Sequence, residues 1–481
     1  MSQSHHRDSA VEAEIRAEAR AEASTPASRG AADEATEADQ RTDDIVAGTV
    51  AGGTEAELPA EEGTAAGGTT ERSLWHDRNF LTMWSGQALS QFGAQITELA
   101  IPVLAVLVLQ ATEFQVGLLG AAGVAAFLLI GLPAGAWIDR MRKRHVMIWA
   151  DAVRAVALLA VPLLWWAGVL EMWHLYVVVL VMGIATTFFD VSYQSIIPSL
   201  VRPKQIAEAN GKLQATYELA NISGPAIGGW LIGILTAPIA ILPTVFTYVA
   251  SLVALVFTLD SEVVTPKHER NPIMQEIGEG LRWVFGNPLL RRIVGCTGLS
   301  NFASTLSYTL LPIFLLRELG FTPAAMGLIF ALGSVGGFVG AIATPHIVQR
   351  IGEARAIPVS AVAFSMVALF LPLAATVPEF ALPLLIAQGF VMSFTVLLYN
   401  ITQVTFRQRI TPPRLLGRMN ASIRFVVWGV MPIAALLAGL LGTWIGVVPT
   451  MWFGAGLALL SALFVVIGPF WRMRELPGAT A

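Results

Sequence analysis

Three acidic residues lie within long apolar stretches of the sequence and are the groups best suited to chemistry. Glu98 lies near the middle of the first stretch, Asp190 in the fourth and Glu218 in the fifth. An apolar environment disfavours the charged form of a carboxyl group, so such a group can take up and release a proton. We predict that Glu98, then Glu218, then Asp190 carry protons. The alternative for each is a paired structural carboxylate.

Uncharged polar side chains occur in the first apolar stretch and in several of the later ones. A mostly apolar cavity with a few polar anchors suits an amphiphilic organic molecule. Within the third stretch, Asp151 and Arg154 are three residues apart and predict a structural ion pair on one helix face, with a substrate site as the alternative. The residues predicted to line a cavity are Gln91, Gln95, Asn301, Tyr308, Gln388, Tyr399, Asn400 and Gln403.

The elements that must position these residues are membrane-crossing helices. The chain has 481 residues, of which 55% are hydrophobic and only 13% charged, with a mean hydropathy of +0.64. Such a composition argues against an ordinary soluble enzyme. The sequence predicts an all-α membrane protein with twelve runs long enough to cross a bilayer. These runs are 80–110, 116–138, 145–168, 173–198, 207–235, 239–259, 290–316, 326–348, 356–377, 381–406, 418–442 and 449–471.

The amino-terminal segment differs from the rest of the chain. Residues 1–71 carry 5 Arg against 16 Asp and Glu, and the first aromatic residue is Trp75. A segment of this kind cannot bury enough apolar surface to offset its ordering entropy, so we expect it to be disordered. We predict a tail over 1–74, a six-helix bundle over 75–259, a linker over 260–289, a second bundle over 290–471 and a short tail over 472–481.

Basic residues predict the orientation of the chain. If the tail is cytoplasmic, the outside loops contain a single basic residue, Arg317, and all the other loop arginines and lysines lie inside. This asymmetry predicts that both termini are cytoplasmic and that the protein lies in the plasma membrane. In the linker, Ile273, Ile277, Leu281 and Phe285 recur at helical spacing and predict a short amphipathic helix. The alternative is a plain linker.

The two halves of the chain echo one another. Arg140 corresponds to Arg350, and Asn210 corresponds to Asn420, both at an offset of 210 residues. Repeated halves with a binding site between them are the usual architecture of secondary transporters.

Two motifs resemble those of the major facilitator superfamily. The loop Gly135-x-x-x-Asp139-Arg140-x-Arg142-Lys143-Arg144 is similar to the signature between the second and third spans of that family, with Arg142 where the family usually has glycine. Ala220-x-x-x-Gly224-Pro225-x-x-Gly228-Gly229 is similar to the signature of its antiporter branch. Further stretches around Asp190, Arg418 and Arg424 look like twelve-span drug:proton antiporters of the macrolide-efflux and enterobactin-exporter type.

The resemblance implies a cytoplasmic gate in the first of these loops. Asp139 would accept hydrogen bonds from the positive end of the eleventh span and pair with Arg418 or Arg424, which would hold the two halves together. Arg140 and Arg144 belong to the same loop. The alternative is that these charges only fix the orientation of the chain.

The resemblance further implies a fold of two pseudo-symmetric six-helix bundles and an exporter of drug-like or natural-product molecules. Such an exporter would use proton antiport and alternating access. The alternatives are a siderophore exporter, an uncoupled facilitator or a non-transporting membrane sensor or assembly factor. The sequence has no phosphate-binding loop, catalytic triad or metal cluster, so we expect no enzyme activity and no cofactor. The expected partners are an amphiphilic substrate, protons and lipid, with no nucleic acid, and the expected state is a monomer.

Overall fold

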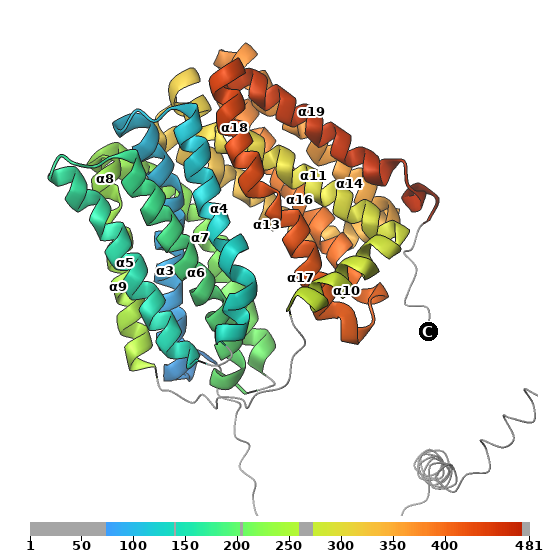
Figure 1. The fold of residues 1–481 in the computed structure, drawn as a ribbon, viewed down its shortest axis with the longest axis horizontal. Coiled ribbons are helices and arrows are strands. Elements are labelled where there is room, and N and C mark those ends of the chain that lie inside the picture. The colour runs from blue at the N-terminus through green and yellow to red at the C-terminus, as the bar shows by residue number, and fades with distance from the viewer. Residues whose placement is uncertain (1–73, 139–140, 203–204, 259–272, 474–481) are drawn as a thin grey trace, which may run out of the picture. The chain divides into compact units, whose positions relative to one another are not determined.

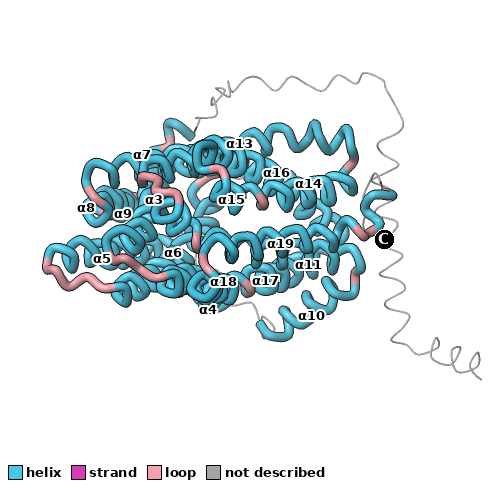
Figure 2. The backbone as a smooth tube through the Cα atoms, turned by 90° about the horizontal axis from the view of Figure 1, so that it is seen from above, coloured by secondary structure: helices cyan, strands magenta, loops and turns pink. Residues whose placement is uncertain are grey.

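The chain folds into long helices joined by short turns. The computed structural model describes residues 74–138, 141–202, 205–258 and 273–473, and every regular element within these ranges is a helix (Figure 2). The predicted amino-terminal tail, most of the linker, Asp139 and Arg140 lie outside the described residues.

The first half is formed by the helices between the start of the described residues and residue 257. A short turn, η1 (Leu74–His76), precedes them, and the π-helical turn η2 (Leu104–Val108) continues the first long helix. The helices are α3 (Arg78–Val103), α4 (Glu113–Ile138), α5 (Lys143–Trp166), α6 (Met172–Leu200), α7 (Ile206–Leu235), α8 (Ala237–Ala240) and α9 (Leu242–Phe257).

The second half lies beside the first, and the two sets of helices diverge toward one end (Figure 1). Its long segments are interrupted where prolines such as Pro312 and Pro432 remove a helical hydrogen bond. The helices are α11 (Pro288–Thr309), α12 (Leu311–Ile313), α13 (Pro323–Ile351), α14 (Glu353–Ala368), α15 (Phe370–Leu373), α16 (Ala381–Ile410), α17 (Pro413–Gly429), α18 (Met431–Ile445) and α19 (Val447–Val466). The short turns are η4 (Phe314–Glu318), η5 (Ala374–Thr376), η6 (Pro378–Phe380) and η7 (Pro469–Arg472).

The long helical segments match the predicted apolar runs in place. Within the described part of the chain, 11 of them are long and apolar enough to cross a membrane. Helix α7, the remaining long helix, has 30 residues, among them Glu208, Lys212 and Glu218. Each predicted run therefore coincides with one long helical segment, to within a few residues at its ends.

The two halves repeat one another in backbone geometry. The π-helical turns η2 and η4 stand 210 residues apart, which is the offset seen between the sequence motifs. Each turn is followed by a residue with positive φ, Gln110 at 52° and Gly320 at 66°. The internal repeat of the sequence is therefore also a repeat of local structure.

A second pair of residues repeats in the same way, and one pair does not. Thr236 has φ 73° and Gly446 has φ 91°, again at an offset of 210 residues. Gly352, which follows α13, has φ 89°, whereas the equivalent Arg142 has φ −71°. The loop before α5 therefore takes a backbone path that does not require glycine, which accounts for the arginine in the first loop motif.

The predicted linker contains the helix α10 (Ile273–Gly286), which contacts α17 and lies outside the long helices (Figure 2). A Cβ atom at Gly280 would overlap with the backbone of Arg418, so the two helices approach closely. Val284 is buried in the core of the second half, whereas Phe285 is exposed. Part of the predicted apolar face therefore packs on protein.

Candidate functional site

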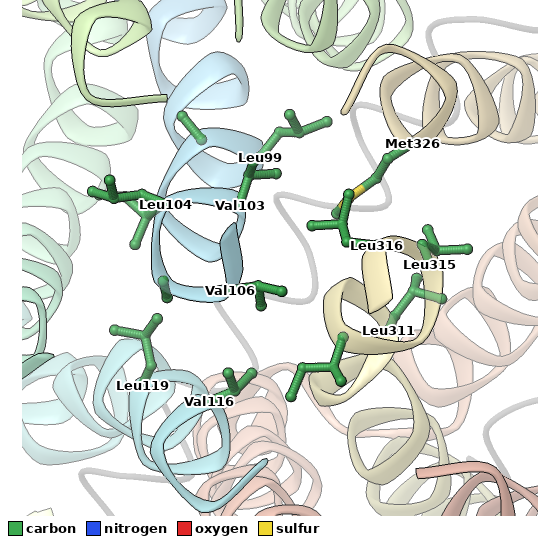
Figure 3. Packing of buried hydrophobic residues seen from close by; sticks show 14 of the residues in the cluster. Leu99, Val103, Leu104, Val106, Val116, Leu119, Leu311, Leu315, Leu316 and Met326 are labelled. Carbon is green, nitrogen blue, oxygen red and sulfur yellow. The ribbon is translucent and has the colours of Figure 1, made fainter. Parts of the chain in front are cut away.

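The two halves share one apolar core at the end of the molecule that carries η2 and η4, which we call the tight end. This cluster combines Leu99 and Val106 from the first half with Leu315, Leu316 and Met326 from the second (Figure 3). All five side chains are less than a tenth exposed. A common core between the halves closes this end to water.

Glycines bring the backbones of the two halves into direct contact at the tight end. A Cβ atom at Gly117 of α4 would lie 2.7 Å from the carbonyl oxygen of Ala435 in α18. A Cβ atom at Gly229 of α7 would lie 2.5 Å from the carbonyl oxygen of Pro323, at the start of α13. Such approaches are open only to glycine, so these two helix pairs are packed as closely as backbones allow.

Arg317 adds a polar connection across the same interface. Its Nη1 atom donates to the carbonyl oxygen of Ala111 at 2.7 Å, and its Nη2 atom donates to that of Val106 at 2.8 Å. Arg317 lies in η4 of the second half, and both acceptors lie at the end of η2 in the first half. The equivalent residue of the first half is Leu107, so this contact breaks the pseudo-symmetry of the repeat.

At the opposite end, which carries α10 and which we call the linker end, the described residues form separate cores. One cluster, with Val284, Phe406 and Met419 among its members, contains only residues of the second half. Another, with Phe80 and Phe189, contains only residues of the first half. The halves therefore share no core there, in contrast to the tight end.

A cavity of about 1040 Å³ lies between the two halves and is bordered by the shared core. Both Glu98 of α3 and Asp190 of α6 line it, and each side chain is exposed to this space. The described residues that line it include no Lys, Arg or His. Its walls are otherwise apolar and aromatic, with contributions from Met182, Tyr248 and Phe330. The site therefore carries negative charge on the first half alone.

Glu218 does not line this cavity. On α7 the lining residues are Tyr217, Asn221 and Pro225, which are four residues apart and share one helix face. Glu218 is one residue further on, which turns it by about 100° away from that face. Gln214 Nε2 donates to Glu218 Oε1 at 2.8 Å, so this acid is paired along its own helix. The structure therefore brings two of the three predicted acids together.

The predicted polar lining residues divide between two spaces. Gln95 lines the large cavity, as do Tyr308 and Gln388, whose Nε2 atom donates to the Tyr308 hydroxyl at 3.2 Å. Asn301, Tyr399 and Asn400 line a separate pocket of about 120 Å³. The described lining residues of the large cavity do not include Gln91, and those of neither space include Gln403.

Tyr399 and its neighbours hold the second half together. The Tyr399 hydroxyl lies 2.9 Å from Thr297 Oγ1, and Asn301 Nδ2 donates to the carbonyl oxygen of Val427 at 3.4 Å. Gln403 is 2% exposed and donates to Asn400 Oδ1 at 3.4 Å. These contacts join α11, α16 and α17, which is a structural role.

The described residues of the predicted gate make contacts within their own half. Arg144 donates to the carbonyl oxygens of Leu255 and Val256 at 2.8 and 2.5 Å, which joins α5 to α9. Arg418 pairs with Glu279 of α10. Arg424 is exposed, with its Cζ atom 5.6 Å from the Trp428 ring centroid.

The antiporter-type motif of α7 packs against its neighbours. A Cβ atom at Gly224 would overlap with the Gln95 side chain of α3, and one at Gly228 would lie 3.3 Å from the Cα atom of Ile96. Pro225 lines the cavity, and its carbonyl oxygen lies against Gly327 of α13. The motif therefore joins α7 to α3 on one side and to α13 on the other.

Thr186 and Thr187 are lining residues that the sequence predictions did not include. They precede Asp190 on α6 by four and three residues, and this helical spacing is a signal that could have identified them. Asp151 and Arg154 form the predicted ion pair, and the Arg154 guanidinium lies between the rings of Phe189 and Tyr248. These rings come from two other helices, so no local sequence signal indicates them.

A family comparison matches residues 83–433, and again 296–480, to the Major Facilitator Superfamily. Macrolide efflux protein A of Streptococcus pyogenes is 22% identical over 403 residues, covering 82% of this chain and 97% of that protein. The multidrug efflux pump Tap of Mycolicibacterium fortuitum is 27% identical over 404 residues, covering 80% and 93%. A bacterial homologue of the iron transporter ferroportin, in its inward-facing state, has a TM-score of 0.65 at 19% identity, covering 84% of this chain and all of that one.

The fold and the family match define a multi-pass membrane transporter rather than an enzyme. The chain belongs to the Major Facilitator Superfamily. The resemblance and the all-α fold class predicted from the sequence are thereby confirmed.

Proposed function

We propose that the protein exports cationic, amphiphilic small molecules in exchange for protons. The observation that carries this proposal is the cavity between the halves, which is lined by Glu98 and Asp190 and, among the described residues, by no basic side chain. A cation is the charge that such a site attracts. The similarity to a macrolide efflux protein and to a multidrug efflux pump supports export as the direction.

The rest of the cavity suits a large apolar body. Its volume of about 1040 Å³ is at the upper end of what small-molecule sites usually offer. Met182, Met326 and Met431 supply flexible apolar surface, and Tyr308 with Gln388 supplies neutral hydrogen-bonding groups. Methionine side chains adapt to ligands of different shape. The site therefore favours a range of amphiphiles rather than one small polar solute.

The same two acids are the proposed proton carriers. Both lie on the first half and both face the cavity, so a proton and the cationic group of a substrate compete for the same carboxylates. Glu218, which is paired with Gln214 outside the cavity, has no such position. Exchange of one cation for the other would couple substrate export to inward proton flow.

The shared core at the tight end and the separate cores at the linker end support an inward-facing state. This interpretation places the linker end and both termini in the cytoplasm, in accordance with the arginine-rich loops. Alternating access would open the tight end, breaking the Arg317 bonds, and would close the linker end. Arg418 and Arg424 would then approach the loop that contains Asp139, Arg140 and Arg144. We propose that a monomer in the plasma membrane performs this cycle.

Everted membrane vesicles test the proposal directly, with the cationic dye ethidium as the probe. We expect energised vesicles to accumulate ethidium and to lose it when a protonophore collapses the proton gradient. Glu98→Gln and Asp190→Asn should each reduce uptake at least tenfold, whereas Glu218→Gln should retain most of it. Uptake that ignores the collapse of the gradient would instead support an uncoupled facilitator.

A second arm tests the charge of the substrate. An anionic siderophore-type probe, such as a catecholate, should not compete with ethidium, because the described cavity residues offer it no positive group. Strong competition by the anionic probe would favour the siderophore-exporter alternative and contradict the proposed substrate class.

A further inference from the structure

A buried ion pair lies beside the cavity and is not used by the function proposed above. Asp151 is fully buried and Arg154 is 3% exposed, and an Arg154 Nη2 hydrogen bond joins them on α5. Asp151 Oδ2 and Arg154 Nε have no hydrogen-bond partner among the described residues. Charged groups inside a membrane span are costly, and a buried pair adds little to stability, so their presence points to function.

Two aromatic rings hold the Arg154 guanidinium in place. Its Cζ atom lies 4.2 Å from the Phe189 ring centroid and 4.7 Å from the Tyr248 ring centroid. Cations over aromatic faces at such distances are attracted by the ring electrons, more strongly where water is excluded. The rings belong to α6 and α9, so Arg154 is fixed where α5, α6 and α9 meet.

The same guanidinium is next to the cavity. Asp190 follows Phe189 directly in α6, and Asp190 and Tyr248 both line the cavity. Arg154 interacts electrostatically with Asp190 as well as with Asp151. The other titratable groups that interact with this cluster, among the described residues, are the phenols of Tyr193 on α6 and Tyr248 on α9. One cation therefore serves two carboxylates, one buried and one in the cavity.

The charge of this cluster depends on what Asp190 holds. With both carboxylates ionised, the net charge is −1. With one proton, or one monovalent cation from the cavity, bound at Asp190, the net charge is zero. A low-dielectric environment favours the neutral combinations. Without Arg154, the two carboxylates would carry −2 and would retain protons, so Asp190 would not release its proton to a substrate.

We propose that Arg154 is a positioning residue whose single charge, shared between Asp151 and Asp190, makes Asp190 exchange one proton for one cationic group of the substrate. This inference rests on the proposed antiport function and deepens it. In the inward-facing state, the substrate cation binds Asp190 and the proton leaves to the cytoplasm. After release of the substrate outside, a proton from that side binds the same carboxylate.

The test measures binding of tetraphenylphosphonium to the purified full-length protein as a function of pH. Wild type should bind this cation more weakly as the pH falls, because protons compete for Asp190. Arg154→Gln removes positive charge and should move the binding profile to higher pH by at least about one unit, a tenfold change in proton concentration. Asp151→Asn removes the competing carboxylate and should move it in the opposite direction.

Two further variants separate charge from packing. The double variant Arg154→Gln with Asp151→Asn keeps the net charge of the cluster and should return the profile close to that of wild type. Arg154→Lys keeps the charge without the planar guanidinium and should also restore it. A purely structural role predicts that the double variant is at least as impaired as either single one. Arg355→Gln, which loses a bond to the carbonyl oxygen of Trp471 far from the cavity, serves as the control for stability.

The outcomes distinguish this inference from the proposed function. If wild type binds tetraphenylphosphonium without any dependence on pH, the antiport function itself fails. If wild type depends on pH but the two single variants shift the profile in the same direction, or leave it unchanged, the role of Arg154 is overturned and the antiport function stands.

Discussion

Replacement of Arg317 should open the tight end of the transporter. Arg317→Leu installs the residue that the first half has at the equivalent position, Leu107, and removes the two bonds to the carbonyl oxygens of Ala111 and Val106. Hydrogen bonds from charged groups contribute about 1.5–3 kcal/mol each when buried. This guanidinium is exposed, so we expect a total of about 1–3 kcal/mol for the pair. The equilibrium should therefore move toward the open tight end by about 5- to 150-fold.

Labelling of a single cysteine measures this shift. The native Cys296 is buried and is replaced by serine, and Val116→Cys places a reporter in the shared core, where Val116 is 3% exposed. A membrane-impermeant maleimide added from outside should react faster in Arg317→Leu by the factor given above. The matched control is Arg355→Leu, which removes an arginine bond to the carbonyl oxygen of Trp471 within the second half. Equal labelling rates in wild type and Arg317→Leu, with both proteins folded, would refute the reasoning.

Three further predictions concern single positions of the fold. Gly229→Ala should shift the same labelling equilibrium by about 1–3 kcal/mol of overpacking, because its Cβ atom would lie 2.5 Å from the Pro323 carbonyl oxygen. Gly233→Ala, one turn further along, meets no atom within 4 Å and is the control; equal effects of the two would contradict the packing argument. The Arg418–Glu279 pair is partly exposed, so a double-mutant cycle with Gln at each position should give a coupling below about 1 kcal/mol in thermal unfolding, and a larger value would indicate a buried pair. Thr236 has φ 73°, so Thr236→Gly should raise the stability by about 1 kcal/mol and Gly446→Thr should lower it; no change in melting temperature in either would contradict the strain argument.

Charge and hydropathy are local properties of the chain, so the features that depend on them alone could be predicted. The twelve apolar runs coincide with the long helices, because a segment that must satisfy its backbone in lipid has little choice but the helix. The repeat at 210 residues appears again in the positions of η2 and η4. The two motifs led to the family, since each is a short contiguous pattern.

Helix rotation could not be predicted in the same way. A helix turns by about 100° for each residue, so its face toward a cavity depends on how its neighbours pack against it. For α7 the neighbours are α3 and α13, and their packing puts Tyr217 and Asn221 in the cavity and leaves Glu218 outside. The rings of Phe189 and Tyr248 around Arg154 likewise come from separate helices.

The sequence alone determined that this chain is a helical membrane protein of repeated halves, with its embedded acids in the first half. Only the tertiary structure decided that Glu98 and Asp190 face one cavity, that the end with Arg317 is closed, and that Arg154 lies beside Asp190. The physical reason is range. Hydropathy and charge act residue by residue along the chain, whereas a cavity is formed where helices distant in sequence pack against one another.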